Sequence, residues 1–171
     1  MRLATMLDRC LGIERRAADL YRRFAEASGP HEDLRAVWRR LASEEDEHAA
    51  ALAIARATID PAVAGESRIE GWDDLVAEAE RVLSEGERMT EPSLDDQLVL
   101  ALDLERTEID LLRRVLLELA GQAAETGAAT SRHALELAEV AGQHSTDARV
   151  RMREALIRAH ERLGVGPLDP G

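Results

Sequence analysis

Apolar positions recur at alternating spacings of three and four residues over four long stretches of the chain. Because an α-helix has 3.6 residues per turn, this spacing places the apolar side chains on one face of a helix. The pattern predicts helices over about 3–27, 31–59, 94–119 and 129–163. No run of β-branched residues alternates with polar ones, so the sequence predicts no strand and an all-α fold.

Turn-forming residues separate these stretches and indicate how the helices connect. Short links around Ser28-Gly29-Pro30 and over 121–130 predict two antiparallel hairpins. The longer connection between the hairpins contains a shorter amphipathic stretch, 72–89, which we expect to be helical. Ser93 followed by Asp96 resembles a capping arrangement at the start of the third long helix.

Two hairpins joined by a long crossover between the second and third helices have the connectivity of a ferritin-like four-helix bundle. We expect residues 1–163 to form this bundle and 164–171 to be a flexible Gly/Pro tail. An internal repeat supports the hairpin organisation, since 11–24 aligns without gaps to 102–115 with seven identities in fourteen positions. The alternative is that amphipathic helices rich in Arg and Glu resemble each other through composition alone.

Composition and charge narrow the classes of function. Hydrophobic residues make up 45% of the 171 residues but aromatic ones only 2%, so the core must consist mainly of Leu, Ala, Val and Ile. The net charge is −12, and this acidity disfavours nucleic acid and anionic membranes as partners while attracting cations. Cys10 is the only cysteine, which excludes a disulfide framework and a cysteine-rich metal site. No segment has the length of a membrane span, so we expect a soluble cytoplasmic protein.

The apolar stripes are interrupted near their middle by acids and histidines. The interrupting residues are Glu14, Glu45, His48, Glu105, Glu108 and His144. Buried carboxylates that converge at one level repel one another, so they require a cation, protonation or arginines reaching inward. Carboxylate and imidazole ligands suit iron or manganese, and four carboxylates balance two divalent cations. The alternative is a polar core layer, or a stripe whose acids face water.

Three of these segments resemble the rubrerythrin branch of the ferritin-like di-iron superfamily. Glu14 is followed seven residues later by Tyr21, as in that family. The segment E-D-E-H-A resembles the Glu-x-x-His-Ala motif of the family through Glu45 and His48. The segment E-R-T-E, 105–108, resembles its Glu-x-x-Glu motif.

The chain departs from the rubrerythrin pattern in two places. Ala141 stands where the family has a glutamate three residues before His144, so one ligand of the five-glutamate pattern is missing. Glu108 takes over its role, or one metal position is weakened and the site holds one ion. The four-cysteine rubredoxin module is also absent from this chain, so reductive turnover would need an external electron donor.

The resemblance implies a di-iron oxidoreductase that reduces peroxide or oxidises ferrous iron with dioxygen or peroxide. It implies terminal ligands at Glu14 and Glu108, bridging ligands at Glu45 and Glu105, and nitrogen ligands at the two stripe histidines. We expect two iron ions per chain, with one iron, manganese or zinc as the alternative. Tyr21 would donate a hydrogen bond to a bridging carboxylate or to bound oxygen species, unless it is a core residue satisfied elsewhere.

We expect a homodimer or a higher homo-oligomer. Two other classes of function remain open. One is iron handling or storage in a closed shell, which the acidic surface would serve by attracting ferrous iron. The other is a bundle with an eroded metal site that serves a structural or partner-binding role, which Ala141 favours. The Glu105 and Glu108 pair favours the metal-dependent functions.

Overall fold

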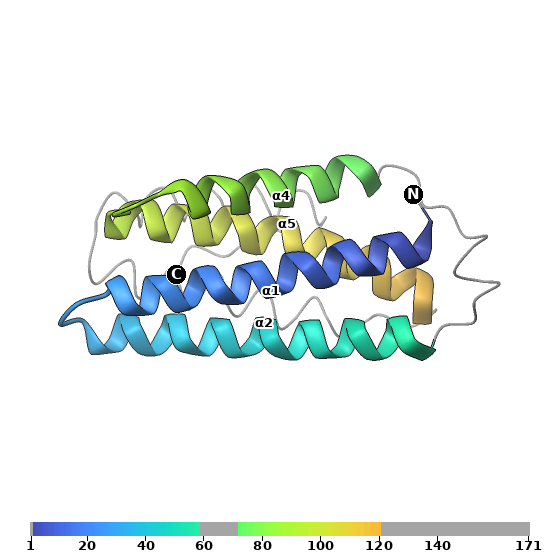
Figure 1. Ribbon diagram of the computed structural model, residues 1–171, viewed down its shortest axis with the longest axis horizontal. Coiled ribbons are helices and arrows are strands. Elements are labelled where there is room, and N and C mark those ends of the chain that lie inside the picture. Colours follow the sequence, from blue (N-terminus) through green and yellow to red (C-terminus); the bar gives the residue numbers. More distant parts are fainter. Residues whose placement is uncertain (1, 59–71, 121–171) are drawn as a thin grey trace, which may run out of the picture.

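A computed structural model of the chain describes residues 2–58 and 72–120, with side chains as far as Ala57 in the first range and Thr107 in the second. These residues form four helices and no strand (Figure 1). The helices are α1 (Leu3–Ala27), α2 (Glu32–Thr58), α4 (Trp72–Arg88) and α5 (Leu94–Ala120). The predicted all-helical fold is confirmed for the described residues, and every helix end lies within about one residue of its predicted position.

Local polar contacts explain where α1 ends and α5 begins. The Ser28 hydroxyl donates a hydrogen bond of 2.7 Å to the Phe24 carbonyl oxygen, and Gly29 follows with a φ of 55°. Glycine adopts this left-handed conformation without steric cost, so the chain turns there. At α5, the Ser93 N–H donates to Asp96 Oδ2 at 3.1 Å and the Asp96 N–H donates to Ser93 Oγ at 3.2 Å. The predicted cap is therefore a reciprocal capping box.

Helices α1 and α2 form an antiparallel hairpin around the turn 28–31. Asp8, near the start of α1, accepts a hydrogen bond of 2.9 Å from Arg56 near the end of α2. Farther along the hairpin, Arg22 of α1 contacts Asp46 of α2. Both helices contribute to a core of leucine, alanine and aromatic side chains that also includes residues of the other two described helices, and each fully buried leucine contributes about 1.5–3 kcal/mol.

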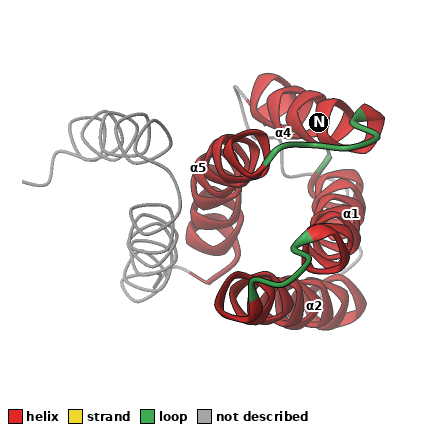
Figure 2. Ribbon diagram, turned by 90° about the vertical axis from the view of Figure 1, so that its left-hand side faces the viewer, coloured by secondary structure: helices red, strands yellow, loops and turns green. Residues whose placement is uncertain are grey.

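Helix α4 lies beside α1 and runs in the same direction. Arg9 makes a two-point contact with Glu80 at 3.0 and 2.6 Å, and Arg16 makes the same contact with Glu87 at 2.7 and 2.9 Å. Each pair is separated by 71 residues, so the two helices keep one register over two turns. The crossover from α2 to α5 therefore contains the predicted helix, seen end-on beside α1 and α5 in Figure 2.

A glycine allows α4 to approach its neighbours closely. A Cβ atom on Gly86 would overlap Leu100 Cδ2 of α5 and would lie 2.9 Å from Leu20 Cδ2 of α1. Both leucine side chains are buried. The absence of a side chain at this position therefore fixes the spacing of α1, α4 and α5.

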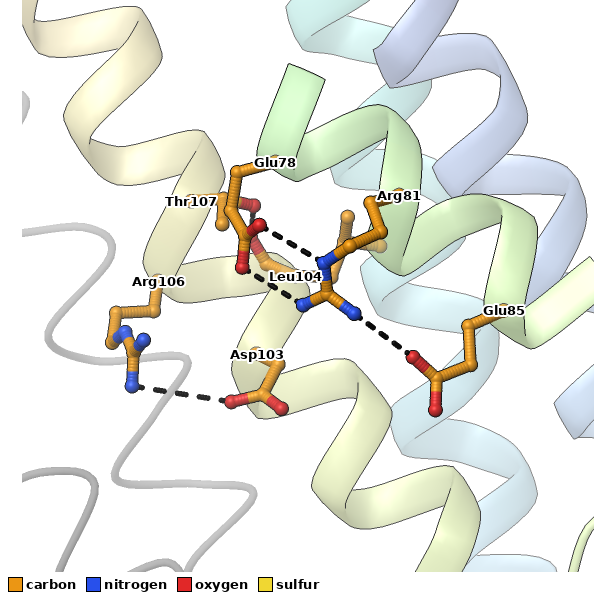
Figure 3. A network of polar contacts seen from close by, with 7 residues as sticks. All are labelled: Glu78, Arg81, Glu85, Asp103, Leu104, Arg106 and Thr107. Carbon is orange, nitrogen blue, oxygen red and sulfur yellow. Dashed lines mark hydrogen bonds and ion pairs between the residues drawn. The ribbon is translucent and has the colours of Figure 1, made fainter. Parts of the chain in front are cut away.

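The outer faces of α4 and α5 carry a network of charged side chains (Figure 3). Arg81 contacts Glu78 at 2.8 Å and Glu85 at 3.2 Å, and Arg106 lies 4.0 Å from Asp103. Water screens ion pairs that are this exposed, so they add little to stability.

Part of the predicted fold lies outside the described residues. This part comprises the fourth long helix, 129–163, the end of the predicted domain and the tail 164–171. The ferritin-like bundle thus stays a prediction. No helix in the described ranges combines the length and the apolar character needed to cross a lipid bilayer.

Candidate metal centre

Three polar side chains meet between α1 and α2. Glu14 comes from α1, and Glu45 and His48 come from consecutive turns of α2. One potential ligand atom from each residue lies within 4.8 Å of the others. Glu14 and Glu45 are 0% and 1% exposed, whereas the His48 side chain is 36% exposed. The cluster, called the triad below, therefore has two buried oxygen donors and one nitrogen donor that reaches the surface.

The hairpin register brings these residues together. Glu45 and His48 are three residues apart, so they share one face of α2. Their neighbours Asp46 and Glu47 are exposed, as the predicted stripe requires. The antiparallel pairing of α1 and α2 then places Glu14 opposite this face.

The imidazole of His48 is held by both carboxylates. Its Nδ1 atom lies 3.0 Å from Glu45 Oε2, which is a hydrogen bond, and 3.6 Å from Glu14 Oε2, which is an ion-pair distance only. Glu14 and then Glu45 raise the pKa of His48 to about 10 because they stabilise its protonated form, while burial acts in the opposite direction. Without a metal, this histidine is a cation at neutral pH.

Burial raises the pKa of Glu45 to about 8. This value includes two smaller effects of opposite sign, because His48 lowers the pKa of Glu45 and Glu14 raises it. A carboxyl group with this pKa carries a proton at neutral pH. The metal-free triad therefore balances its charge with protons on Glu45 and His48.

Glu14 is the least satisfied member of the triad. Neither of its side-chain oxygens has a hydrogen-bond partner among the described residues, and Oε1 of Glu45 has none either. Leaving a buried polar group without a hydrogen bond costs about 1–3 kcal/mol, and more for a charged group. Three buried carboxyl oxygens without hydrogen-bond partners among the described residues, in the same cluster as a histidine, are thus suited to bind a cation.

The donor set of the triad fits a transition-metal ion. Carboxylate oxygens and imidazole nitrogen are ligands for iron, manganese and zinc. His48 and Glu45 would have to lose their protons on binding, because only the deprotonated forms are ligands. The triad alone leaves coordination positions that other side chains or small molecules would fill.

Glu105 of α5 is buried and is engaged by Tyr21. The Tyr21 hydroxyl donates a hydrogen bond of 2.8 Å to Glu105 Oε1, and both residues are at most 2% exposed. The Tyr21 ring stacks on Trp38 with a centroid separation of 5.8 Å and an interplanar angle of 16°. The tyrosine is therefore fixed at both its ring and its hydroxyl group. Glu105 is not grouped with the triad within 4.8 Å among the described residues.

The predicted ligand set is thus present in part. Glu14, Glu45 and His48 come together, and Glu105 is buried with Tyr21 as its hydrogen-bond donor. The predicted ligands Glu108 and His144 lie outside the described side chains, as does Ala141. The predicted ligand roles of all these residues remain untested.

Cys10 adds a group that the sequence pattern did not connect to the site. It lies one helical turn before Glu14 and is fully buried. Burial, followed by the negative charge of Glu14, raises the pKa of the Cys10 thiol to about 12. The thiol is therefore protonated and unreactive at neutral pH, and it does not act as a ligand in this state.

Comparison with known proteins adds no family assignment. No protein-family model, curated protein or solved structure gives a significant match to this chain. The similarity to rubrerythrins rests on the motif residues alone and stays a prediction.

Proposed function

We propose that this protein is a metal-dependent oxidoreductase of rubrerythrin type, which reduces peroxide or oxidises ferrous iron at a site between α1 and α2. The observation that supports the proposal most is the buried Glu14 carboxylate, whose two oxygens have no hydrogen-bond partner among the described residues. Glu45 and His48 extend this group into a set of oxygen and nitrogen donors. A purely structural polar layer would be expected to pair these oxygens with donors.

The bound metal would supply a redox-active Lewis acid for peroxide or dioxygen. The chain's own residues would bind and shield the reacting groups. Glu14 and Glu45, which are almost fully buried, would hold the metal away from bulk water. His48 reaches the surface and would exchange the proton on Nδ1 for the metal. Tyr21 would orient the Glu105 carboxylate through its hydrogen bond.

The full proposal includes two iron ions per chain. Glu105, Glu108 and His144 would complete the ligand set for the second ion. Cells would have to supply electrons from an external donor, and we propose a cytoplasmic homodimer or higher homo-oligomer. With Ala141 at an expected ligand position, a single iron, manganese or zinc ion is the alternative stoichiometry.

Metal content after anaerobic loading tests the proposal. The protein would be loaded with Fe(II), desalted, and measured by elemental mass spectrometry, with Glu45→Gln and Glu47→Gln compared with the wild type. Both substitutions replace one carboxyl group by an amide within the same turn of α2, but only Glu45 is buried in the triad. We expect iron to be retained by the wild type and by Glu47→Gln, and lost by Glu45→Gln.

The result also separates the alternative functions. About two irons per chain would make peroxide turnover the next assay, and about one iron would assign a single-ion site. Iron in large excess over two per chain, together with a native mass far above a dimer, would favour storage. If none of the three proteins binds iron although all of them are folded, the metal-dependent functions would be refuted and a structural bundle would remain.

A further inference from the structure

A second polar site lies on the outside of the α1–α2 hairpin. It is a pocket of about 380 Å³ lined by Arg22, Ala25 and Glu26 of α1 and by Arg35 and Arg39 of α2. Ala25 is buried, whereas Arg22, Glu26 and Arg39 are exposed. The small alanine side chain leaves room between longer charged side chains. The volume falls in the range of pockets that bind small molecules, roughly 300–1,000 Å³.

The lining of this pocket contains more arginines than acids. Its lining has three arginines and one glutamate, whereas the chain carries a net charge of −12. Guanidinium groups present several N–H donors in a planar fork, which matches carboxylate and phosphate oxygens. Three such groups from two helices are therefore suited to an anion with more than one acidic group.

Two of the arginines are oriented by acids that do not line the pocket. Arg22 donates to Asp19 at 2.7 Å and also contacts Asp46. Arg35 contacts Glu32 at 2.5 Å, on the preceding turn of α2, and also donates a hydrogen bond to the Gly29 carbonyl oxygen. Each of these guanidinium groups keeps N–H donors that the acids do not use. These contacts hold the two guanidinium groups in place and offset their positive charge.

Arg39 is the arginine that remains available. No hydrogen bond or ion pair within the described residues engages Arg39, and the same holds for Glu26. Arg39 can offer its complete donor fork to a ligand, since none of its N–H groups is committed. Glu26 would repel one end of a simple anion but would accept a hydrogen bond from a ligand hydroxyl or ammonium group.

We propose that this pocket binds a small organic anion with two or more carboxylate or phosphate groups, with Arg39 as its main contact. The site is separate from the triad and does not depend on metal binding. Arg22 and Arg35 would contact the second acidic group, and the acids behind them would hold them in place. The ligand would join α1 to α2 near their connecting turn.

Calorimetric titration of the metal-free protein at constant ionic strength tests this site. The probes are succinate, which carries two carboxylates, and inorganic phosphate. Arg39→Gln would be compared with Arg15→Gln, which removes the same charge from an exposed position on α1 outside the pocket. We expect one probe molecule per chain, with affinity reduced about tenfold or more by Arg39→Gln and changed less than about twofold by Arg15→Gln.

The choice of probes identifies the chemical class of the ligand. Tighter binding of succinate would assign a polycarboxylate, and tighter binding of phosphate would assign a phosphate ester. Two results would overturn the proposal. One is no detectable binding of either probe at millimolar concentrations. The other is equal weakening by both substitutions, because the net charge of the protein alone would then explain the binding.

Discussion

The Tyr21 hydroxyl donates a hydrogen bond of 2.8 Å to Oε1 of Glu105, so a residue of α1 holds a buried carboxylate of α5. The stacked Trp38 indole of α2 fixes the tyrosine ring in this position. One side chain thus connects three helices. This contact also orients the carboxylate that we propose as a ligand for the second metal ion.

Replacement of Tyr21 by phenylalanine should destabilise the metal-free protein by about 1–3 kcal/mol, because a buried carboxylate loses a hydrogen-bond donor. Urea denaturation would measure the loss. A double-mutant cycle with Glu105→Gln supplies the control, since the Tyr21→Phe substitution should cost less when the carboxylate is already replaced. Equal costs in both backgrounds would show that the hydrogen bond does not couple the two residues.

Two glycines inside helices should respond to alanine in opposite ways. Gly86→Ala should destabilise the protein by about 1–2 kcal/mol, because its Cβ would overlap Leu100 and crowd Leu20. Gly12→Ala in α1 should stabilise it by up to about 1 kcal/mol, because no atom lies within 4 Å of the added Cβ and alanine favours the helix. Thermal and urea unfolding of the pair would check both signs. Stabilisation by Gly86→Ala would mean that α4 packs less closely than the structure indicates.

The stability of the metal-free protein should fall as the pH rises from about 5 to about 10. The folded pKa of Glu45 is raised from 4.5 to about 8, and that of His48 from 6.5 to about 10. Between its unfolded and folded pKa values, each group therefore binds more protons in the folded state than in the unfolded state. The stabilisation from each group is fully present below its unfolded pKa and is lost as the pH rises through its folded pKa. Urea unfolding with a chelator present would measure the slope.

A variant with Glu45→Gln and His48→Gln is the control for this pH dependence. It should have a flatter stability profile between pH 5 and pH 10, since both titrating groups are removed. An unchanged slope in the double variant would assign the effect to other groups.

Metal binding should release protons near neutral pH. Glu45 and His48 both carry protons there in the metal-free state, and metal ligands must be deprotonated. We expect about two protons per ion on adding Mn(II) at pH 7, and fewer above pH 9. Calorimetry in buffers of different ionisation enthalpy would count them. Metal binding without proton release would place the ion away from the triad.

The helices and much of the candidate centre could be predicted from the sequence because both depend on local periodicity. The alternating spacing placed Glu14, Glu45 and Glu105 on buried faces, and all three are buried. Gly29 and Ser93 marked helix ends through local backbone chemistry. These features require no knowledge of how the helices pack.

The distances between the helices could not be predicted in this way. Periodicity placed Glu105 at the level of the triad but could not show that Tyr21 binds it while Glu14 lacks a hydrogen-bond partner among the described residues. The contacts of Arg9 and Arg16 could not be predicted from the sequence either, because their partners lie on α4. The position of α4 beside α1 is a property of the tertiary fold.

The α1–α2 hairpin has a consequence for how the candidate centre forms. Glu14 is 31 residues from Glu45 and 34 residues from His48, and all three lie within two helices joined by a short turn, so their meeting requires only that this hairpin closes. Closing one hairpin costs less loop-closure entropy than joining segments that are farther apart along the chain. The α1–α2 hairpin alone therefore brings the triad together, without a residue of α4 or α5.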